Sequence, residues 1–334
     1  MRSEFGFLKH LKNHFNLSKI GDDCAVIPKD ARSDYLITTD TLVEDIDFRL
    51  EWTTAKLLGC KALSVSISDV AAMGGIPRYS MISVSIPESL WATDFLDRFY
   101  EGYIERANNF DRFHLPGPPR VVELIGGDIS NSDCKMTVDS TVIGEVPRGK
   151  AILRSGAKPG DRIYVTGLLG IAALGLRLLE QGHRLESSDE NGKAAVEYRA
   201  IQRQLSGHSA KGHQYLDIAS SMIDLSDGLS SDLAHICEAS GVGAKLFAEK
   251  IPFTGYKALD VRIHGLTKND LFKLALHGGE DFELLFTVPP EKALTHESLL
   301  FEPIGEITES AGRIELTRNG LLEELEPKGY THFT

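Results

Sequence analysis

The chain contains 334 residues, of which 42% are hydrophobic and 25% charged, and its formal net charge at pH 7 is -12. This composition is typical of a soluble globular protein, and no apolar run approaches the ~18 residues that a membrane-spanning helix needs. The acidic balance and the lack of a Lys/Arg block argue against a nucleic acid bound through its phosphates. Because domains usually contain about 100 to 200 residues, the length predicts two domains.

The first 15 residues have apolar side chains at helical spacing, interrupted by Lys9, Lys12 and His14. They lack the continuous apolar stretch and small-residue cleavage site of a secretory signal, so we expect the first helix of a cytoplasmic protein. The four cysteines are Cys24, Cys60, Cys134 and Cys237. Without a C-x-x-C pair they favour neither a zinc knuckle nor a disulfide framework, and we expect reduced, mostly buried thiols.

The first half predicts strands over 35–42 and 78–87, separated by a helix over 53–75, and then an amphipathic helix over 91–110. One face of that last helix is apolar and consists of Phe95, Leu96, Phe99, Tyr100, Tyr103 and Ile104. A proline-rich turn over 114–120 precedes a strand over 121–128 and an alternating strand over 135–147. We interpret this half as a mixed α/β unit.

A glycine-rich and basic segment with a turn at 157–161 places the domain boundary near residue 149, which predicts domains over 1–148 and 149–334. The second half then predicts strands over 162–167, 243–251 and 282–290, and helices over 168–182 and 270–281. We expect the polar stretch over 182–215 to be an exposed helix with mobile flanks and without a site. The alternation favours α/β, and antiparallel-like runs leave α+β open.

Residues 220–233, SSMIDLSDGLSSDL, place Asp224, Ser226 and Asp227 between a short apolar strand and a helix. Ser226 and Asp227 are good N-cap residues, and a carboxylate suits the positive end of a helix dipole. This motif alone favours capping over a functional site.

Carboxylates, however, recur at strand ends and glycine-flanked turns along the whole chain. They are Asp22, Asp23, Asp40, Asp69, Asp128, Asp224 and Asp227. The backbone at such turns can approach a ligand closely. Mg²⁺ is bound through a few carboxylates together with substrate phosphate oxygens. Because converging carboxylates repel each other without cations, the set predicts a magnesium-dependent phosphate site.

Several common site motifs are missing from the sequence. There is no P-loop, no G-x-S-x-G elbow and no H-E-x-x-H. Gly167, Gly170 and Gly175 depart from G-x-G-x-x-G and are better explained by close packing of a helix on a strand. This leaves metal-dependent phosphate chemistry on another scaffold.

Eight segments together resemble, in order and spacing, the thiamine-monophosphate kinase family. They are GDDCAV, TTDTLVEDIDF, SDVAAMGGIP, IGGD, RSGAKPGDRIYVTG, IDLSDGLSSDL, GGEDFELLF and KGYTHF, and they span roughly residues 4 to 334. The resemblance implies the two-domain α/β architecture of the aminoimidazole ribonucleotide synthetase and selenophosphate synthetase superfamily, a homodimer formed through N-terminal domains, and ATP bound in a cleft. The implied enzyme is a kinase that converts ATP and thiamine monophosphate to ADP and thiamine diphosphate.

Matched residue by residue, the resemblance implies three groups of site residues. The metal-binding positions are Asp23, Thr38, Thr39, Asp40, Asp69, Asp128, Asp224 and Asp227. The ATP-contacting positions are Gly127, Asp128, Arg154 and Ser226. The substrate positions are Asp47, Glu280 and Tyr330. Alternatively, the Glu280 carboxylate is a solvated acid at a helix end and Tyr330 is an ordinary surface aromatic.

The implied mechanism has no general base, because a phosphate monoester is already ionised. Several Mg²⁺ ions and Arg154 would neutralise the charge on the transferred group. Glu280 would hydrogen-bond the aminopyrimidine of thiamine, and Tyr330 would stack on the aromatic cation.

The chain departs from the family pattern in two places. It reads LVEDIDF where the family has LVEGVHF, so Asp45 replaces a glycine and Asp47 replaces a histidine that contacts the substrate. The family's RP-x-PR segment is also absent. Two alternatives stay open: a related ATP-dependent kinase or synthetase acting on another phosphomonoester, and a non-catalytic nucleotide-binding protein.

Overall fold

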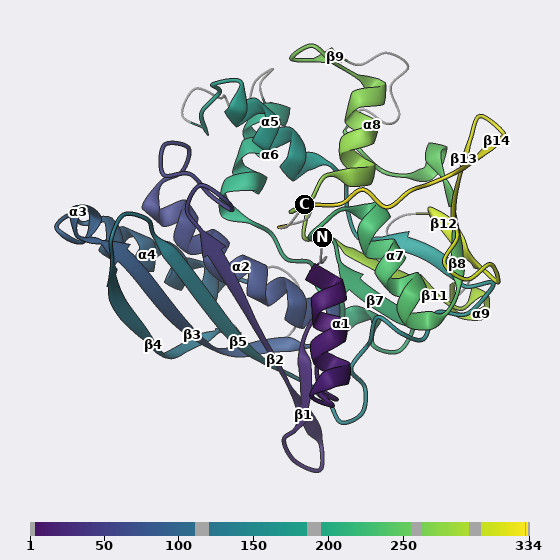
Figure 1. The fold of residues 1–334 in the computed structure, drawn as a ribbon, viewed down its shortest axis with the longest axis horizontal. Helices are drawn as coiled ribbons and strands as arrows, with labels where there is room; N and C mark the ends of the chain where they lie inside the picture. The colour runs from purple at the N-terminus through teal and green to yellow at the C-terminus, as the bar shows by residue number, and fades with distance from the viewer. Residues whose placement is uncertain are drawn as a thin grey trace.

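The structure is a computed structural model that describes residues 4–110, 120–185, 195–254, 262–293, 302–330 and residue 332. Two lobes lie side by side, each built on one large sheet (Figure 1). Up to residue 147 the elements are α1 (Glu4–His14), β1 (Ala25–Pro28), β2 (Ser33–Val43), α2 (Ala55–Ala72), β3 (Ile76–Pro87), α3 (Glu88–Trp91), α4 (Phe95–Asn109), β4 (Glu123–Ser132) and β5 (Thr137–Pro147).

The second lobe has its first strand at residue 162. Its elements are β6 (Arg162–Val165), α5 (Ile171–Glu180), α6 (Ala195–Ser206), β7 (Ser221–Asp224), α7 (Leu229–Ser240), β8 (Gly243–Phe247), β9 (Arg262–Ile263), β10 (Leu266–Thr267), α8 (Lys268–His277), β11 (Leu284–Val288), α9 (Pro290–Ala293), β12 (Gly305–Thr308), β13 (Ile314–Arg318) and β14 (Leu321–Glu324).

The sheet of the first lobe has the strand order β1-β2-β5-β3-β4, and every pair is antiparallel except β3 with β4. Since side chains alternate along a strand, one face carries buried residues such as Leu36, Ile82 and Val142, which pack in the same core as α2 and α4. The two helices approach closely, because a Cβ on Gly59 would lie 1.9 Å from the Phe99 carbonyl oxygen.

The sheet of the second lobe has the order β14-β13-β8-β12-β6-β11-β7, with only β8 and β13 parallel. All five residues of β11 are buried, as expected for a central strand covered on both faces. The predicted mixed α/β class is confirmed. The strand pairs of both sheets are mainly antiparallel, which is the α+β arrangement that the sequence left open.

Helix α2 joins the two lobes. It is buried nearly all round because it packs on its own sheet, on β7 and on α6. Its polar residues turn toward the second lobe: Ser64 donates to the Ser206 carbonyl oxygen at 3.2 Å, and Ser68 donates to Asp224 at 2.7 Å. The cleft between the lobes therefore has a fixed wall.

Three expectations about packing need correction. The polar stretch contains α6, which is not an exposed helix: Ala200, Ile201 and Leu205 are buried in the core of the second lobe. Gly175 does serve close packing, but against α6 rather than a strand, since its Cβ would lie 2.0 Å from the Ala200 carbonyl oxygen. Ile104, placed on the apolar face of α4, is 40% exposed. Residues 111–119, with most of the proline-rich turn, and 186–194 lie outside the described part of the chain.

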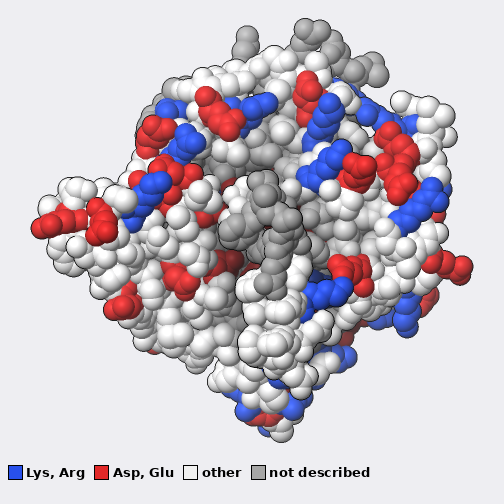
Figure 2. All heavy atoms as spheres, in the orientation of Figure 1, with Lys and Arg blue, Asp and Glu red and all other residues white. Residues whose placement is uncertain are grey.

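The thiols agree with the expectation of free cysteines, although only Cys24 and Cys237 are buried and Cys134 is exposed. Among the described residues, no helix combines the length and the apolar character needed to cross a membrane. On the face shown in Figure 2, acidic and basic side chains are interspersed rather than gathered into one basic field.

Candidate active site

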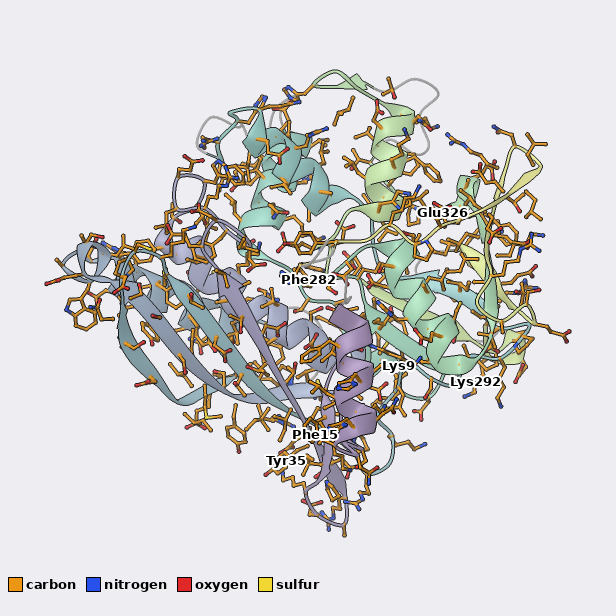
Figure 3. The ribbon with its side chains drawn as sticks, in the orientation of Figure 1. Lys9, Phe15, Tyr35, Phe282, Lys292 and Glu326 are labelled. Atoms are coloured by element: carbon orange, nitrogen blue, oxygen red, sulfur yellow. The ribbon has the colours of Figure 1, made fainter. Side chains whose placement is uncertain are left out.

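A cavity of about 1560 Å³ lies between the two lobes and is lined by both. Its walls come from β2, the loop over 45–49, α2, the β7–α7 turn, the segment over 277–282 and Tyr330. Helix α1 adds Lys9 and Lys12, and the Lys9 ammonium pairs with Glu238 of α7 at 3.1 Å (Figure 3). Because a single small-molecule pocket usually measures about 300 to 1,000 Å³, the cavity has room for a nucleotide and a second substrate.

Carboxylates from four separate segments converge on the floor of this cavity. One oxygen each of Asp23, Asp69 and Asp224 lies within 4.8 Å of the others. Asp40 belongs to the same group, because the charge of Asp23 raises the pKa of Asp40 and the charge of Asp40 raises the pKa of Asp69. Asp69 accepts a short hydrogen bond from Thr38. Five predicted metal-binding residues are thus brought together by the fold.

The cluster holds its protons tightly. Burial raises the pKa of Asp224 to about 8 and that of Asp40 to about 6, and in both cases the charge of Asp23 adds to the effect. The pKa of Asp69 is raised well above its ordinary value, first by burial and then by Asp40 and Asp224. Several ionised carboxylates at this site therefore need a positive partner.

Arg154 supplies one positive charge to the cluster. Its Nη2 and Nε donate to the same oxygen of Asp23 at 2.5 and 3.2 Å. The backbone N–H of Arg154 also donates to Asp22 at 2.9 Å, which fixes the segment that follows the boundary between the lobes. One guanidinium cannot balance four carboxylates, so the arrangement remains strongly acidic.

Two oxygens of the cluster test whether divalent cations fit. Asp23 Oδ2 and Asp40 Oδ2 are buried and have no hydrogen-bond partner. An unpartnered buried carboxylate oxygen is costly, whereas hard cations take oxygen ligands of this kind. The all-oxygen donor set formed by Asp23, Asp40, Asp69 and Asp224 suits Mg²⁺.

The β7–α7 turn shows which residue caps helix α7. Gly228, with φ of 117°, is the N-cap of α7, and it makes no side-chain cap hydrogen bond. The carboxylate that receives the free amides is Asp232, which accepts from Gly228 N at 2.9 Å and Asp227 N at 3.3 Å. Capping by Ser226 or Asp227 is therefore wrong, and both residues line the cavity.

A second acidic group lies beside this turn. Asp227, Asp232 and His235 each place one ligand atom within 4.8 Å of the others. Burial and then Asp227 raise the pKa of Asp232 well above its ordinary value, while burial and the charge of Arg154 lower the pKa of His235 to about 4. His235 is thus neutral at pH 7, and the acidic character continues from the main cluster toward α7.

Glu280 also lines the cavity. Its carboxylate pairs with the Lys61 ammonium at 2.6 Å and accepts a short hydrogen bond from the Gln204 side chain. Its backbone has φ of +65°, and its N–H donates to the Ser226 carbonyl oxygen at 2.9 Å. Glu280 is therefore a positioned group, and its interpretation as a solvated acid at a helix end is wrong.

The neighbouring Asp281 explains how Glu280 is held. The Asp281 carboxylate accepts from Gly170 N at 2.5 Å and from Ala172 N at 3.0 Å, at the N-terminus of α5. Phe282, with φ of +49°, is buried where the lobes meet (Figure 3). Asp281 thus anchors the segment to α5, and the preceding residue, Glu280, lines the cavity.

Asp47 and Asp45 lie in the loop after β2. Asp47 lines the cavity and accepts from Val43 N at 2.8 Å. Burial raises its pKa, the charge of Glu280 raises it further, and His332 and Lys61 lower it. Asp45 has φ of +69°, which is the left-handed backbone conformation that favours glycine. Its carboxylate pairs with Lys135 at 3.0 Å.

Tyr330 lies at the mouth of the cavity. It is 49% exposed, its backbone N–H donates to the Asp227 carbonyl oxygen at 3.2 Å, and its ring contacts His332 edge-on at 5.0 Å. Tyr330 also lines the cavity.

Three predicted residues lie away from this cavity. Thr39 lies on the opposite face of β2, where it donates to Asp139 at 2.9 Å. Gly127 and Asp128 belong to β4, the edge strand of the sheet. Strands β5 and β3 lie between β4 and β2, the strand that carries Thr38 and Asp40. A Cβ on Gly127 would lie 1.9 Å from the Ile82 carbonyl oxygen, so glycine is required there for strand pairing.

Sequence reasoning missed several residues of the cavity. Lys61 lies within the apolar pattern of α2, Asp232 lies five positions after Asp227, and Gln204 lies in the polar stretch where no site was expected. Asp232 could have been found, because it is an acid in the first turn of the predicted helix. Lys61 and Gln204 have no signal of their own.

Comparisons with known proteins agree with this geometry. Residues 21–146 match the AIR synthase related protein N-terminal domain, and residues 158–316 match the corresponding C-terminal domain. The thiamine-monophosphate kinase of Salmonella typhimurium is 36% identical over 94% of this chain and 91% of its own length. That of Bacillus subtilis is 35% identical over 94% of this chain and 93% of its own length.

The solved structure of AaThiL complexed with AMPPCP and TMP superposes with a TM-score of 0.80 at 31% identity, covering 99% of this chain and 97% of the other. Sequence, fold and cavity all lead to the same assignment: the chain belongs to the thiamine-monophosphate kinase family of AIR synthase related proteins.

Proposed function

We propose that this protein transfers the γ-phosphoryl group of ATP to thiamine monophosphate and so forms ADP and thiamine diphosphate. The observation that carries the proposal is the cluster of buried carboxylates with orphaned oxygens in a cavity large enough for two ligands. AMPPCP, a nucleotide analogue, and TMP are the ligands named for the AaThiL structure.

We assign the metal ions of the reaction to the acidic cluster. Asp23, Asp40, Asp69 and Asp224 would hold Mg²⁺, and Asp227 would extend the site toward the β7–α7 turn. Bound Mg²⁺ supplies neutralisation of the polyphosphate charge. Arg154, held in place by Asp23, would add a guanidinium at the transferred group.

The acceptor end of the cavity suits a cation. Glu280 and Asp47 lie close enough for their charges to interact, and Tyr330 lines the same cavity. A carboxylate can bind the aminopyrimidine and an aromatic ring can stack on the thiazolium. The acceptor phosphate is ionised at neutral pH, so none of these residues needs to act as a general base.

We also propose a homodimer formed by the first lobe. The edge of its sheet exposes apolar side chains on and beside β3 and β4: Met81, Val121, Ile125 and Ile129. Such a cluster on a sheet edge favours pairing with a second copy. Dimer formation would also give Gly127 and Asp128 a place at the nucleotide site, which a single chain does not give them.

Two further expectations stay predictions. The division of the chain near residue 149 is supported by the gap between the two family matches, which end at residue 146 and begin at residue 158. We also predict a cytoplasmic location, because ATP is found there and thiols stay reduced there.

The test is to incubate the purified chain with ATP, Mg²⁺ and thiamine monophosphate, and to measure thiamine diphosphate as its fluorescent thiochrome derivative. We expect one ADP for each thiamine diphosphate. ATP binding without product would instead favour another phosphomonoester, for which Asp47 is the residue to examine first.

A further inference from the structure

A group of three metal-ligating side chains lies away from the cavity. One nitrogen of His183, one nitrogen of His264 and one carboxylate oxygen of Glu197 lie within 4.8 Å of one another. The His264 Nε2 and Glu197 Oε1 atoms are 2.6 Å apart, and the rings of the two histidines meet edge-on with centroids 4.3 Å apart. None of the three lines the cavity between the lobes.

Each of the three comes from a different segment and is held by the local backbone. His183 follows α5 in a Schellman turn, in which His183 N donates to the Leu178 carbonyl oxygen at 3.0 Å and Gly182 N to that of Leu179 at 3.0 Å. Glu197 belongs to the first turn of α6. The site is therefore built on two helix ends.

The third side chain lies at the tip of a hairpin. His264 and Gly265 connect β9 to β10, and both have positive φ, 47° and 82°. A positive φ is uncommon for a residue other than glycine, so the backbone at His264 is a special position. The hairpin leads directly into α8, whose N-terminus is fixed by the capping box of Thr267 and Asp270. In Figure 1, β9 and the helices α5 and α6 lie together at the top of the view.

The chemistry of the three donors is specific. Two imidazoles and one carboxylate form the donor set that proteins use for Zn²⁺, with bonds of about 2.0 to 2.2 Å. Tetrahedral coordination at that length separates neighbouring ligand atoms by about 3.3 Å, so small side-chain rotations suffice to close the present group around an ion. A three-ligand site leaves one position for water.

We propose that His183, Glu197 and His264 form a second metal site, which takes one Zn²⁺ ion or a similar first-row divalent cation. The ion would join the end of α5, the start of α6 and the β9–β10 hairpin. This site differs in kind from the acidic cluster, because imidazole nitrogen favours Zn²⁺ whereas an all-oxygen set favours Mg²⁺.

The test is Zn²⁺ titration of the metal-free, full-length chain by calorimetry, with excess Mg²⁺ present to occupy the oxygen-only site. Co²⁺ is added in parallel, because its visible absorption reports tetrahedral nitrogen and oxygen ligation. We expect one tight Zn²⁺ equivalent in the unchanged protein. The variants His264→Asn, His183→Asn and Glu197→Gln should each bind Zn²⁺ at least about tenfold more weakly, given that even the loss of a hydrogen bond to a metal ligand costs about 10- to 100-fold in affinity.

His264→Asn is the most informative variant, because asparagine tolerates the left-handed backbone and keeps the hairpin. The control is His10→Gln, since His10 and His14 stack at 5.3 Å on α1 and offer a competing pair of imidazoles. Equal Zn²⁺ affinity in the unchanged protein and His264→Asn would overturn the proposal. Loss of the tight equivalent in His10→Gln alone would overturn it as well, by assigning the ion to α1.

Discussion

Ser68 on α2 donates a 2.7 Å hydrogen bond to Asp224 at the end of β7, so a hydroxyl of the first lobe fixes a carboxylate of the second. Both side chains are buried. The acidic cluster thus depends on contact between the lobes, and its geometry is set before any ligand arrives.

Replacing Ser68 by Ala should destabilise the protein. The change removes one of the few donors to a buried carboxylate, and a lost buried hydrogen bond of this kind costs about 1 to 3 kcal/mol. Urea unfolding of the metal-free variant measures the effect. Ser206→Ala is the control, because the Ser206 hydroxyl donates only to carbonyl oxygens near it in sequence, those of Gln202 and Gly207, and Ser206 is partly exposed. Equal unfolding midpoints for the Ser68 variant and the parent would contradict the role of this bond.

The stability of the metal-free protein should fall as pH rises. The folded-state pKa of Asp224 is raised from 3.8 to about 8 and that of Asp40 to about 6. A carboxyl whose folded pKa exceeds its unfolded value stabilises the fold when protonated, so its contribution is present below about pH 4 and is lost as pH rises through the folded pKa. Unfolding between pH 5 and pH 8 measures this slope, relative to the same series for Asp224→Asn.

Bound Mg²⁺ should counteract this loss of stability at higher pH. Because the ion binds the ionised carboxylates, its affinity should increase between about pH 6 and pH 8 and its binding should release protons. Calorimetry in two buffers of different ionisation enthalpy detects those protons. A Mg²⁺ affinity that does not change with pH would show that the cluster is not its site.

Arg154→Lys should reduce the rate of phosphoryl transfer by about 100-fold or more, the scale of losing one preorganised donor at a developing charge. Lysine keeps the charge but loses the two donors that Arg154 directs at Asp23. The measurement is the rate of thiamine diphosphate formation. Arg148→Lys is a matched control, because Arg148 pairs with Asp34 at 3.0 Å and does not line the cavity.

Glu280→Gln should raise the KM for thiamine monophosphate and leave the KM for ATP unchanged. The substitution keeps the shape of the side chain but removes the negative charge that faces the cavity and pairs with Lys61. Steady-state kinetics with each substrate varied in turn separate the two constants. Glu249→Gln, outside the cavity, is the control. A rise in the KM for ATP alone would contradict the prediction, because it would show that Glu280 binds ATP rather than thiamine monophosphate.

Ile125→Glu should weaken the proposed dimer. Ile125 is 50% exposed in the single chain, so a charge there is tolerated by the fold but opposes burial between two copies. Light scattering after gel filtration gives the mass, and Leu321→Glu on β14, where Leu321 is 75% exposed, is the control. Equal masses for the parent and both variants would place the interface elsewhere.

Much of the fold could be predicted because its pattern is local. The alternation of buried and half-buried residues in β5 and the apolar spacing of α7 follow from the periods of strand and helix. The buried helix α6 was not predictable in this way. Its polar residues Arg203 and Gln204 resemble those of a solvated helix, but they contact Glu283 and Glu280.

The sequence by itself determined which residue types stand at the turns, namely Asp23, Asp40, Asp69 and Asp224, and so the kind of cation they suit. Only the tertiary structure decided that these four meet while Thr39 and Asp128 lie elsewhere. The same is true of Lys61, Gln204 and the group of His183, Glu197 and His264. The physical reason is that periodicity fixes the face on which a side chain lies, whereas contacts between residues far apart in the sequence depend on how helices and sheets pack.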